Sequence, residues 1–365
     1  MGRCVALVLV LCGALVGGST VPPLAPTLAA ATPTPVQVYG AWHCSNDYCT
    51  WGAVRTVAEF DTMNHWLIDR GDGRPSVNLV VLSFVHPLKL LNGTTDATTL
   101  GGVPRGMTAD IVGYFTSRGV RVMVSIGGIT YTDAWNQALA KNAALLGQRA
   151  AELATRLGAG VEIDYEENRS PNLTGLQAFI DAYRAIHPYD AAGADPAARL
   201  TIDLAAGDRW LIALTRKATA DWLRTDLPVL DYANAMVPAK QPSTSAAIAN
   251  WQEHVDGKPQ YAPPIPPLAP GKLTGSVYVA EGSKVRPECN GFASSLQKST
   301  GSFVQTVASN VPGASPGMLG WMFWAAEKPA VRGVGTQPPN TCEGGVGVGA
   351  TTYAVPIPMP PLRQQ

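Results

Sequence analysis

The sequence predicts an α/β protein in which residues 32–328 form a single (β/α)8 barrel. Eight short apolar runs recur about every 40 residues, and helical patterns lie between them. The runs are rich in Val, Ile and Leu and do not alternate with polar residues, as expected of strands covered on both faces. A doubly wound open sheet is the alternative, but it usually has fewer strands, and the chain has no dinucleotide-binding glycine fingerprint.

The elements follow one another in strand–helix order. The predicted strands are VQVYGAW (36–42), VNLVVLSFV (77–85), VRVMVSIGG (120–128), GVEIDYE (160–166), RLTIDLAA (199–206), VLDYANAMV (229–237), GSVYVAEG (275–282) and GMLGWMFWA (317–325). Helical patterns include TADIVGYFTSRG (108–119), KNAALLGQRAAELATRLG (141–158), LTGLQAFIDAYRAI (173–186) and FASSLQKSTGSFVQTVASNV (292–311). Gly119 and Gly158 stand where C-terminal helix caps are expected.

Both ends of the chain are expected to lie outside the barrel. Residues 1–31 read as a signal peptide and a Pro/Thr-rich lead-in, with a basic Arg3 before an apolar stretch too short for a convincing membrane span. We therefore expect a secreted, extracellular protein, with an uncleaved anchor as the alternative. The Gly- and Pro-rich tail, 329–365, is expected to replace a regular last helix.

The cysteines are consistent with export. Cys4 and Cys12 fall inside the signal peptide, which leaves four cysteines in the mature chain, an even number that suggests disulfides. Four cysteines allow three pairings, and we favour Cys44–Cys49 with Cys289–Cys342, the second tethering the tail. Zinc is the competing interpretation, but no CxxC or HxxxH spacing supports it.

The charge pattern limits the partners. The formal net charge is zero and 15% of residues are charged, against about 25% in ordinary soluble domains. No Lys/Arg run is present, which argues against nucleic acid or an anionic membrane as the main partner. The histidines form no ligand pattern, so no cofactor or metal is expected, and we expect a monomer.

The stretch GAGVEIDYEEN carries three acids two residues apart. Alternation along a strand places Glu162, Asp164 and Glu166 on one face, with Ile163 and Tyr165 on the other. The apolar pair suits the helix-facing side, so the carboxylates point into the barrel. Crowded carboxylates cannot all ionise, and at least one pKa should rise. Glu166 would then lie at the C-terminal mouth as a general acid. A buried acid cluster with no function is the alternative.

These residues resemble a known family. SIGG (125–128) followed by GVEIDYE resembles the paired signatures of glycoside hydrolase family 18, the chitinase-type barrels. VYGAW, LSF, LDYANAM and GWMFW are similar to the family's first, second, sixth and eighth strands. The resemblance therefore spans nearly the whole mature chain in order, and it implies the same barrel.

The resemblance also implies roles for individual residues. Glu166 would protonate the glycosidic oxygen, Asp164 would orient the substrate's acetamido group, and Glu162 stands at the middle acid of the signature. The substrate's own N-acetyl carbonyl would attack the anomeric carbon, and water would open the resulting oxazolinium ion with retention; this family is an exception to the two-carboxylate scheme. The residues expected to line the substrate site are Trp324, Met236, Phe84, Ser125, Gly127, Gly128 and Trp42. Trp135, near a strand end, is a further candidate sugar platform.

Three positions depart from the family pattern. Ala159 replaces the first Asp of the signature, and Glu162 replaces its middle Asp. Pro238 stands where the family has a tyrosine whose hydroxyl holds the reacting carbonyl, and proline offers neither a hydroxyl nor a backbone N–H. Loss of that bond would cost on the order of 10²-fold in rate. The candidates to replace it are Tyr278, Tyr131, Asn234 and Gln241.

The leading functional hypothesis is a secreted hydrolase of β-1,4-linked N-acetylglucosamine in chitin or chitooligosaccharides, so the expected partner is an amino-sugar polysaccharide or oligosaccharide. A catalytically weak chitinase-like lectin is the alternative from another class, and Pro238 favours it. An endo-β-N-acetylglucosaminidase acting on N-glycans remains open, since loops set the substrate. A last alternative is an ordinary retaining glycosidase with Glu281 as nucleophile.

Overall fold

The chain folds around a closed barrel of eight parallel strands. The structure is a computed structural model that describes residues 37–44, 51–69, 77–205, 210–236, 244–278 and 302–324, together with residues 2, 73, 75, 207, 280–281, 284–285 and 300. The strand order around the barrel is β1-β2-β5-β6-β7-β8-β9-β12, and β12 pairs with β1 to close it. This confirms the (β/α)8 barrel expected from the spacing of the apolar runs.

Each predicted run contains most of one barrel strand. The strands are β1 (Val38–His43), β2 (Leu79–Val85), β5 (Arg121–Gly127), β6 (Gly160–Asp164), β7 (Leu200–Ala205), β8 (Ala233–Met236), β9 (Leu273–Tyr278) and β12 (Gly320–Trp324). Two small antiparallel pairs lie outside the barrel, β3 (Thr99–Leu100) with β4 (Val103–Pro104) and β10 (Ala280–Glu281) with β11 (Lys284–Val285).

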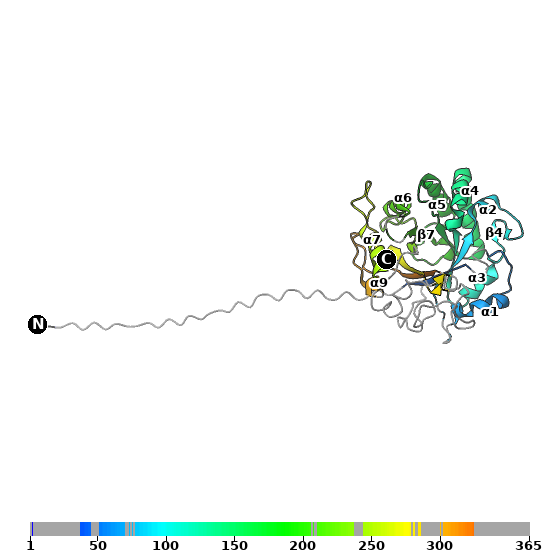
Figure 1. Cartoon of the computed structure of the whole chain (residues 1–365), viewed down its shortest axis with the longest axis horizontal. Helices are drawn as coiled ribbons and strands as arrows, with labels where there is room; N and C mark the ends of the chain where they lie inside the picture. The colour runs from blue at the N-terminus through cyan, green and yellow to red at the C-terminus, as the bar shows by residue number, and fades with distance from the viewer. Residues whose placement is uncertain are drawn as a thin grey trace. The chain divides into compact units, whose positions relative to one another are not determined.

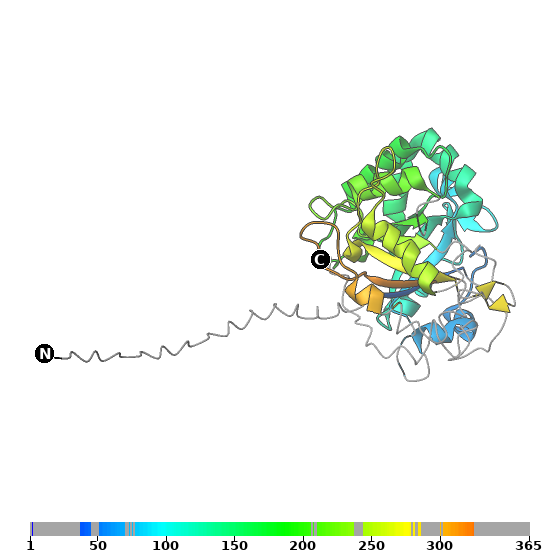
Figure 2. The same cartoon turned by 60° about the vertical axis from the view of Figure 1, so that its left-hand side comes forward.

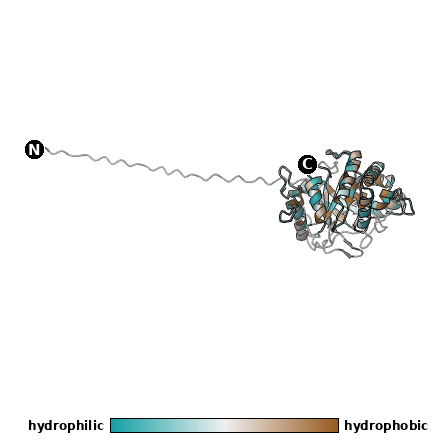
Figure 3. Cartoon of the chain, turned by 90° about the horizontal axis from the view of Figure 1, so that it is seen from above, coloured by the Kyte–Doolittle hydropathy of each residue, from teal (hydrophilic) through white to brown (hydrophobic). Residues whose placement is uncertain are grey.

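Helices connect the strands and surround the barrel (Figure 1, Figure 2). They are α1 (Val57–Ile68), α2 (Pro87–Asn92), α3 (Ala109–Thr116), α4 (Thr132–Leu157), α5 (Leu173–Ile186), α6 (Ile212–Lys217), α7 (Thr244–Asp256) and α9 (Ser302–Thr306). The short helical turns are η1 (Ile129–Tyr131), η2 (Pro196–Ala198), η3 (Ala218–Trp222) and η4 (Pro270–Lys272). Hydrophobic and hydrophilic residues are mixed on these helices (Figure 3), as expected of elements with one face on the barrel.

Three predicted helices have different lengths in the structure. Helix α3 ends at Thr116 and is capped by Ser117, so the cap expected at Gly119 is wrong. Helix α4 begins nine residues earlier than the pattern 141–158 and is kinked at Asn142, whose backbone is not helical. Of the pattern 292–311, helix α9 covers only Ser302–Thr306. The expected C-terminal cap at Gly158 is confirmed, because this residue ends α4 in the left-handed conformation that glycine adopts without strain.

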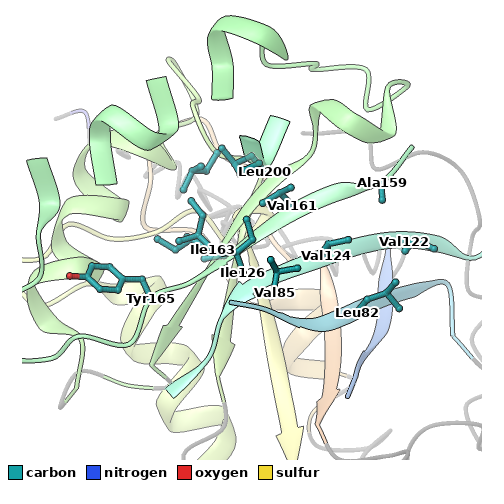
Figure 4. Close-up of a cluster of buried hydrophobic side chains, with 14 of the residues drawn as sticks. Leu82, Val85, Val122, Val124, Ile126, Ala159, Val161, Ile163, Tyr165 and Leu200 are labelled. Carbon is teal, nitrogen blue, oxygen red and sulfur yellow. The ribbon is translucent and has the colours of Figure 1, made fainter. Parts of the chain in front are cut away.

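The barrel separates two hydrophobic cores. The larger lies between strands and helices, and its members include Val124, Ile126, Val161, Ile163 and Tyr165 (Figure 4). The smaller fills the barrel interior and consists of Val38, Trp42, Leu79, Val81, Met123, Tyr232, Leu319 and Met322. The polar residues Ser125, Glu162, Asp164, Thr201, Asp203, Asn234, Thr274 and Ser276 are also buried, on barrel strands that carry the apolar residues of the larger core at alternating positions. The barrel interior is therefore partly polar.

Several expectations concern segments outside the described residues. The chain divides into the units Met1–Thr32 and Pro33–Gln365, and of the first only Gly2 is described. The signal peptide, the tail 329–365 and the residues Cys49, Cys289 and Cys342 lie outside the described part, so these expectations stay predictions. Cys44 is buried just after β1. Within the described ranges, no helix combines the length and apolarity needed to cross a bilayer.

Candidate active site

A pocket of about 350 Å³ opens at the C-terminal end of the barrel strands. This is the end at which barrel enzymes carry their active sites. Its walls come from the ends of β1, β2, β6, β7, β8 and β12 and from the turn η1. The lining residues are Trp42, Phe84, Ile129, Thr130, Tyr131, Asp164, Glu166, Asp203, Met236 and Trp324.

Strand β6 and the residues that follow it place Asp164 and Glu166 in this pocket. Ile163 and Tyr165 belong to the core between strands and helices (Figure 4), so Glu162 and Asp164 point the other way, into the barrel. The strand ends at Asp164, and Glu166 follows it at the pocket wall. The predicted placement of Glu166 at the mouth is confirmed, although it lies beyond the strand rather than on it.

The close packing of β5 against β6 depends on glycine. A Cβ atom on Gly127 would lie 1.8 Å from the backbone oxygen of Asp164 and 2.3 Å from Nε1 of Trp135. A Cβ on Gly128 would lie 3.1 Å from the ring of Phe84. Both glycines also have positive φ angles, which side chains rarely adopt. Gly127 and Gly128 therefore shape the site by leaving room for its other members.

Trp135 is not a sugar platform, contrary to the expectation from sequence. Its side chain is fully buried in the core, and Nε1 donates hydrogen bonds to the backbone oxygens of Ile126 (3.2 Å) and Asp164 (3.0 Å). It lies in the first turn of α4 and faces the barrel wall. Trp135 thus fixes the backbone that carries Asp164 instead of contacting ligand.

Glu162 lies beneath the pocket in a hydrogen-bonded network. Its side chain is fully buried. Nε1 of Trp42 donates to Oε1 (2.9 Å), and Nδ2 of Asn234 donates to Oε2 (2.7 Å). The same Asn234 nitrogen donates to Oδ1 of Asp203 (3.0 Å), and Thr274 donates its hydroxyl to Oδ1 of Asn234 (2.6 Å). Glu162 does not line the pocket, and it holds Trp42, which does.

The pKa values of four neighbouring carboxyls are raised, those of Glu162, Asp164, Glu166 and Asp203. Burial is the largest cause in every case, because it disfavours the charged form. It raises the pKa of Glu162 to about 7 and the pKa of Glu166 to about 7. Burial and the neighbouring charges of Glu166 and Glu162 hold the pKa of Asp164 well above its usual range. The interaction between the Asp164 and Glu166 side chains raises the pKa of Asp164 further and partly offsets the effect of burial on the pKa of Glu166.

Aromatic side chains form much of the remaining pocket wall. The rings of Trp42 and Trp324 meet edge to face at 6.3 Å between centroids, and Phe84 lies 5.9 Å from Trp324. Such faces suit the apolar side of a sugar ring or another flat ligand. Tyr131 also lines the pocket and packs against His86, 4.6 Å away, which caps α2 and does not line the pocket.

The structure brings most of the predicted site residues together. Glu166, Asp164, Trp324, Met236, Phe84 and Trp42 line the pocket. Ser125 is buried on β5 beside Glu162, its partner in the strand register. Of the proposed substitutes for the absent tyrosine, Tyr131 lines the pocket and Asn234 lies beneath it. The side chain of Tyr278, together with Gln241 and Pro238, lies outside the described residues, as does the side chain of Glu281.

Asp203, Ile129 and Thr130 line the pocket but were not predicted from the sequence, and Asp203 is the titratable one among them. It lines the pocket from β7 and is almost fully buried. One signal was available, because an acid in the middle of the apolar run RLTIDLAA is costly to bury unless it is paired or used. In the described part of the chain, no group of three or more His, Cys, Asp or Glu side chains is arranged to hold a metal ion.

No protein-family model matches the sequence, and no curated protein matches it either. Among solved structures, a GH18 chitinase from Pseudoalteromonas aurantia is 13% identical, with a TM-score of 0.48 over 72% of this chain and 90% of that chain. A chitinase from Rhizomucor miehei is 13% identical, with a TM-score of 0.45 over 79% of this chain and 94% of that one.

An endo-β-N-acetylglucosaminidase from Cordyceps militaris is also similar, at 13% identity and a TM-score of 0.45 over 87% of this chain and 88% of that chain. At 13% sequence identity, the similarity to these structures says nothing about the activity or substrate of this chain. The chain resembles glycoside hydrolase family 18 in its motifs, and it forms the eight-stranded barrel that those motifs imply.

Proposed function

We propose that this protein is a glycoside hydrolase that cleaves β-1,4-linked N-acetylglucosamine in chitin or chitooligosaccharides. The observation that carries the proposal is the Asp164–Glu166 pair, which lines an aromatic-walled pocket at the C-terminal mouth of the barrel. A pKa near 7 lets Glu166 hold a proton at neutral pH and release it during the reaction, as a general acid must.

Each of these pocket residues has its own role in the proposed reaction. Glu166 protonates the glycosidic oxygen of the leaving sugar. Asp164 lies on the adjacent wall and holds the N-acetyl group of the substrate, whose carbonyl oxygen attacks the anomeric carbon. Water then opens the oxazolinium ion, and the anomeric configuration is retained, as in the substrate-assisted exceptions to the two-carboxylate scheme. Trp324 and Trp42 supply ring faces on which the sugar packs.

A carbohydrate-binding protein with little or no turnover is the second candidate. It is favoured by Pro238, which offers no hydroxyl where the resembled family has a tyrosine. The two candidates differ in one measurable respect. A hydrolase releases shorter chitooligosaccharides, whereas the binding protein holds the same ligand unchanged.

The test compares Glu166→Gln with the wild type on chitotetraose and on an aryl chitobioside. We expect the wild type to cleave both and the variant to lose about 10²–10⁴-fold in kcat, the usual contribution of a general acid. Glu167→Gln is the matched control, because Glu167 is the adjacent glutamate and does not line the pocket. Binding of chitotetraose without cleavage by the wild type would select the second candidate, and no binding would reject both.

We also propose that the protein is exported. The support is the N-terminal stretch MGRCVALVLVLCGALVGGST, with its basic residue, apolar stretch and small residues. Expression of the full chain should place a shortened protein in the medium or the periplasm. Retention of the full-length chain in the cell would contradict the proposal.

A further inference from the structure

Asp203 is a third carboxyl in the pocket wall that the proposed reaction does not use. Its neighbours Ile202 and Leu204 belong to the core between strands and helices, so Asp203 points into the barrel. It pairs in register with Asn234 on β8. The pocket therefore receives a carboxyl from β7 in addition to Asp164 and Glu166.

Asn234 holds this carboxyl in place. Thr274 donates its hydroxyl to Oδ1 of Asn234, which turns the amide nitrogen toward the acids. That nitrogen donates to Oδ1 of Asp203 at 3.0 Å and to Oε2 of Glu162 at 2.7 Å. The side chain of Asp203 is thus positioned by a residue on the neighbouring strand and needs no ligand to order it.

The surroundings of Asp203 favour its neutral form. The residues that line the pocket include three carboxyls and no Lys, Arg or His, as far as the described residues show. Glu162 and Asp164 face Asp203 from β6, and Asn234 faces it from β8. Burial, followed by the charges of Glu162 and Asp164, holds the pKa of Asp203 well above its usual range. A neutral carboxyl can donate a hydrogen bond, which a carboxylate cannot.

We propose that Asp203 binds the substrate as a neutral carboxylic acid that donates its O–H to an acceptor oxygen of the sugar in the pocket. This inference rests on the proposed function, because it takes the ligand to be an N-acetylglucosamine oligomer. It places a substrate-binding residue on β7, in addition to Asp164 at the end of β6 and Glu166 just after that strand. It also gives ligand binding a pH dependence that is separate from the protonation of Glu166.

The test measures binding of chitotetraose between pH 5 and 9 in a Glu166→Gln background, which prevents cleavage and removes the titration of Glu166. Affinity should fall as the pH rises through the raised pKa of Asp203, because the carboxylate no longer donates. The added change Asp203→Asn keeps a donor that does not ionise, so its affinity should vary less with pH. Asp203→Ala should weaken binding roughly tenfold at pH 5, the value of one hydrogen bond.

Asp133→Asn in the same background is the control, since Asp133 is an exposed acid in the first turn of α4. It should bind like the parent at every pH. If Asp203→Asn and its parent lose affinity in parallel, the inference is wrong while the proposed function stands. If the wild type cleaves nothing and the parent binds no oligosaccharide, the proposed function fails and the inference with it. Thermal unfolding of each variant shows whether it is folded.

Discussion

At the scale of single residues, the site depends on carboxyls that keep their protons. Glu166 is the proposed proton donor, and burial raises its pKa to about 7. The protonated form is the active one, so activity should be present below about pH 7 and fall about tenfold per pH unit above it. Measurement of kcat/KM on an aryl chitobioside between pH 5 and 9 checks this. Constant activity up to pH 9 would contradict the assignment of Glu166.

The indole of Trp42 combines a pocket wall with a hydrogen bond to Glu162. Trp42→Phe removes the donor and leaves Oε1 of a fully buried carboxyl without it. We expect a loss of about 1–3 kcal/mol in the free energy of unfolding beyond the effect of the smaller ring. Urea unfolding measures it, with Trp251→Phe as control, because Nε1 of that buried tryptophan has no hydrogen-bond partner among the described residues. Equal losses in the two variants would contradict the role of the bond.

At the scale of elements, the strands could be predicted because each is a compact apolar run. Strand β6 was the clearest, since Glu162 and Asp164 alternate with Val161 and Ile163. Asp203 was missed because β7 carries a single acid, which makes no repeating pattern. Trp135 was placed in the pocket on the ground that it follows a strand closely, but the direction of its side chain depends on how α4 packs, and the sequence does not contain that information.

The junction of β5 and β6 should tolerate no side chain at Gly127. A Cβ there would overlap the backbone oxygen of Asp164, which cannot move without displacing the strand. Gly127→Ala should therefore destabilise the fold by about 1–3 kcal/mol or more. Gly113→Ala is the contrasting control, because Gly113 is an exposed position of α3 with nothing within 4 Å, where alanine should stabilise by about 0.5–1 kcal/mol. Urea unfolding should show a lower free energy of unfolding for Gly127→Ala and a higher one for Gly113→Ala than for the wild type. Changes of the same sign in both variants would contradict this account.

At the scale of the whole molecule, the polar part of the barrel interior makes the fold sensitive to pH. Burial raises the pKa of Glu162 and of Glu166 from the ordinary value of 4.5 to about 7. Between these values the folded chain binds more protons than the unfolded chain. The stability that these groups contribute is therefore fully present below about pH 4.5 and is lost as the pH rises through 7, by at most about 1.4 kcal/mol per unit for each group.

Urea unfolding between pH 4.5 and 7 tests this linkage. We expect the free energy of unfolding of the wild type to decline across this range, and Glu166→Gln to decline less steeply because one proton-binding group is gone. Glu152→Gln, at an exposed position of α4, should follow the wild type. Partly exposed carboxylates with lowered pKa values, such as Asp96, act in the opposite direction, but only at lower pH. An equal slope in Glu166→Gln and the wild type would show that the folded chain holds no extra proton on Glu166, and the general acid would then have to be sought elsewhere.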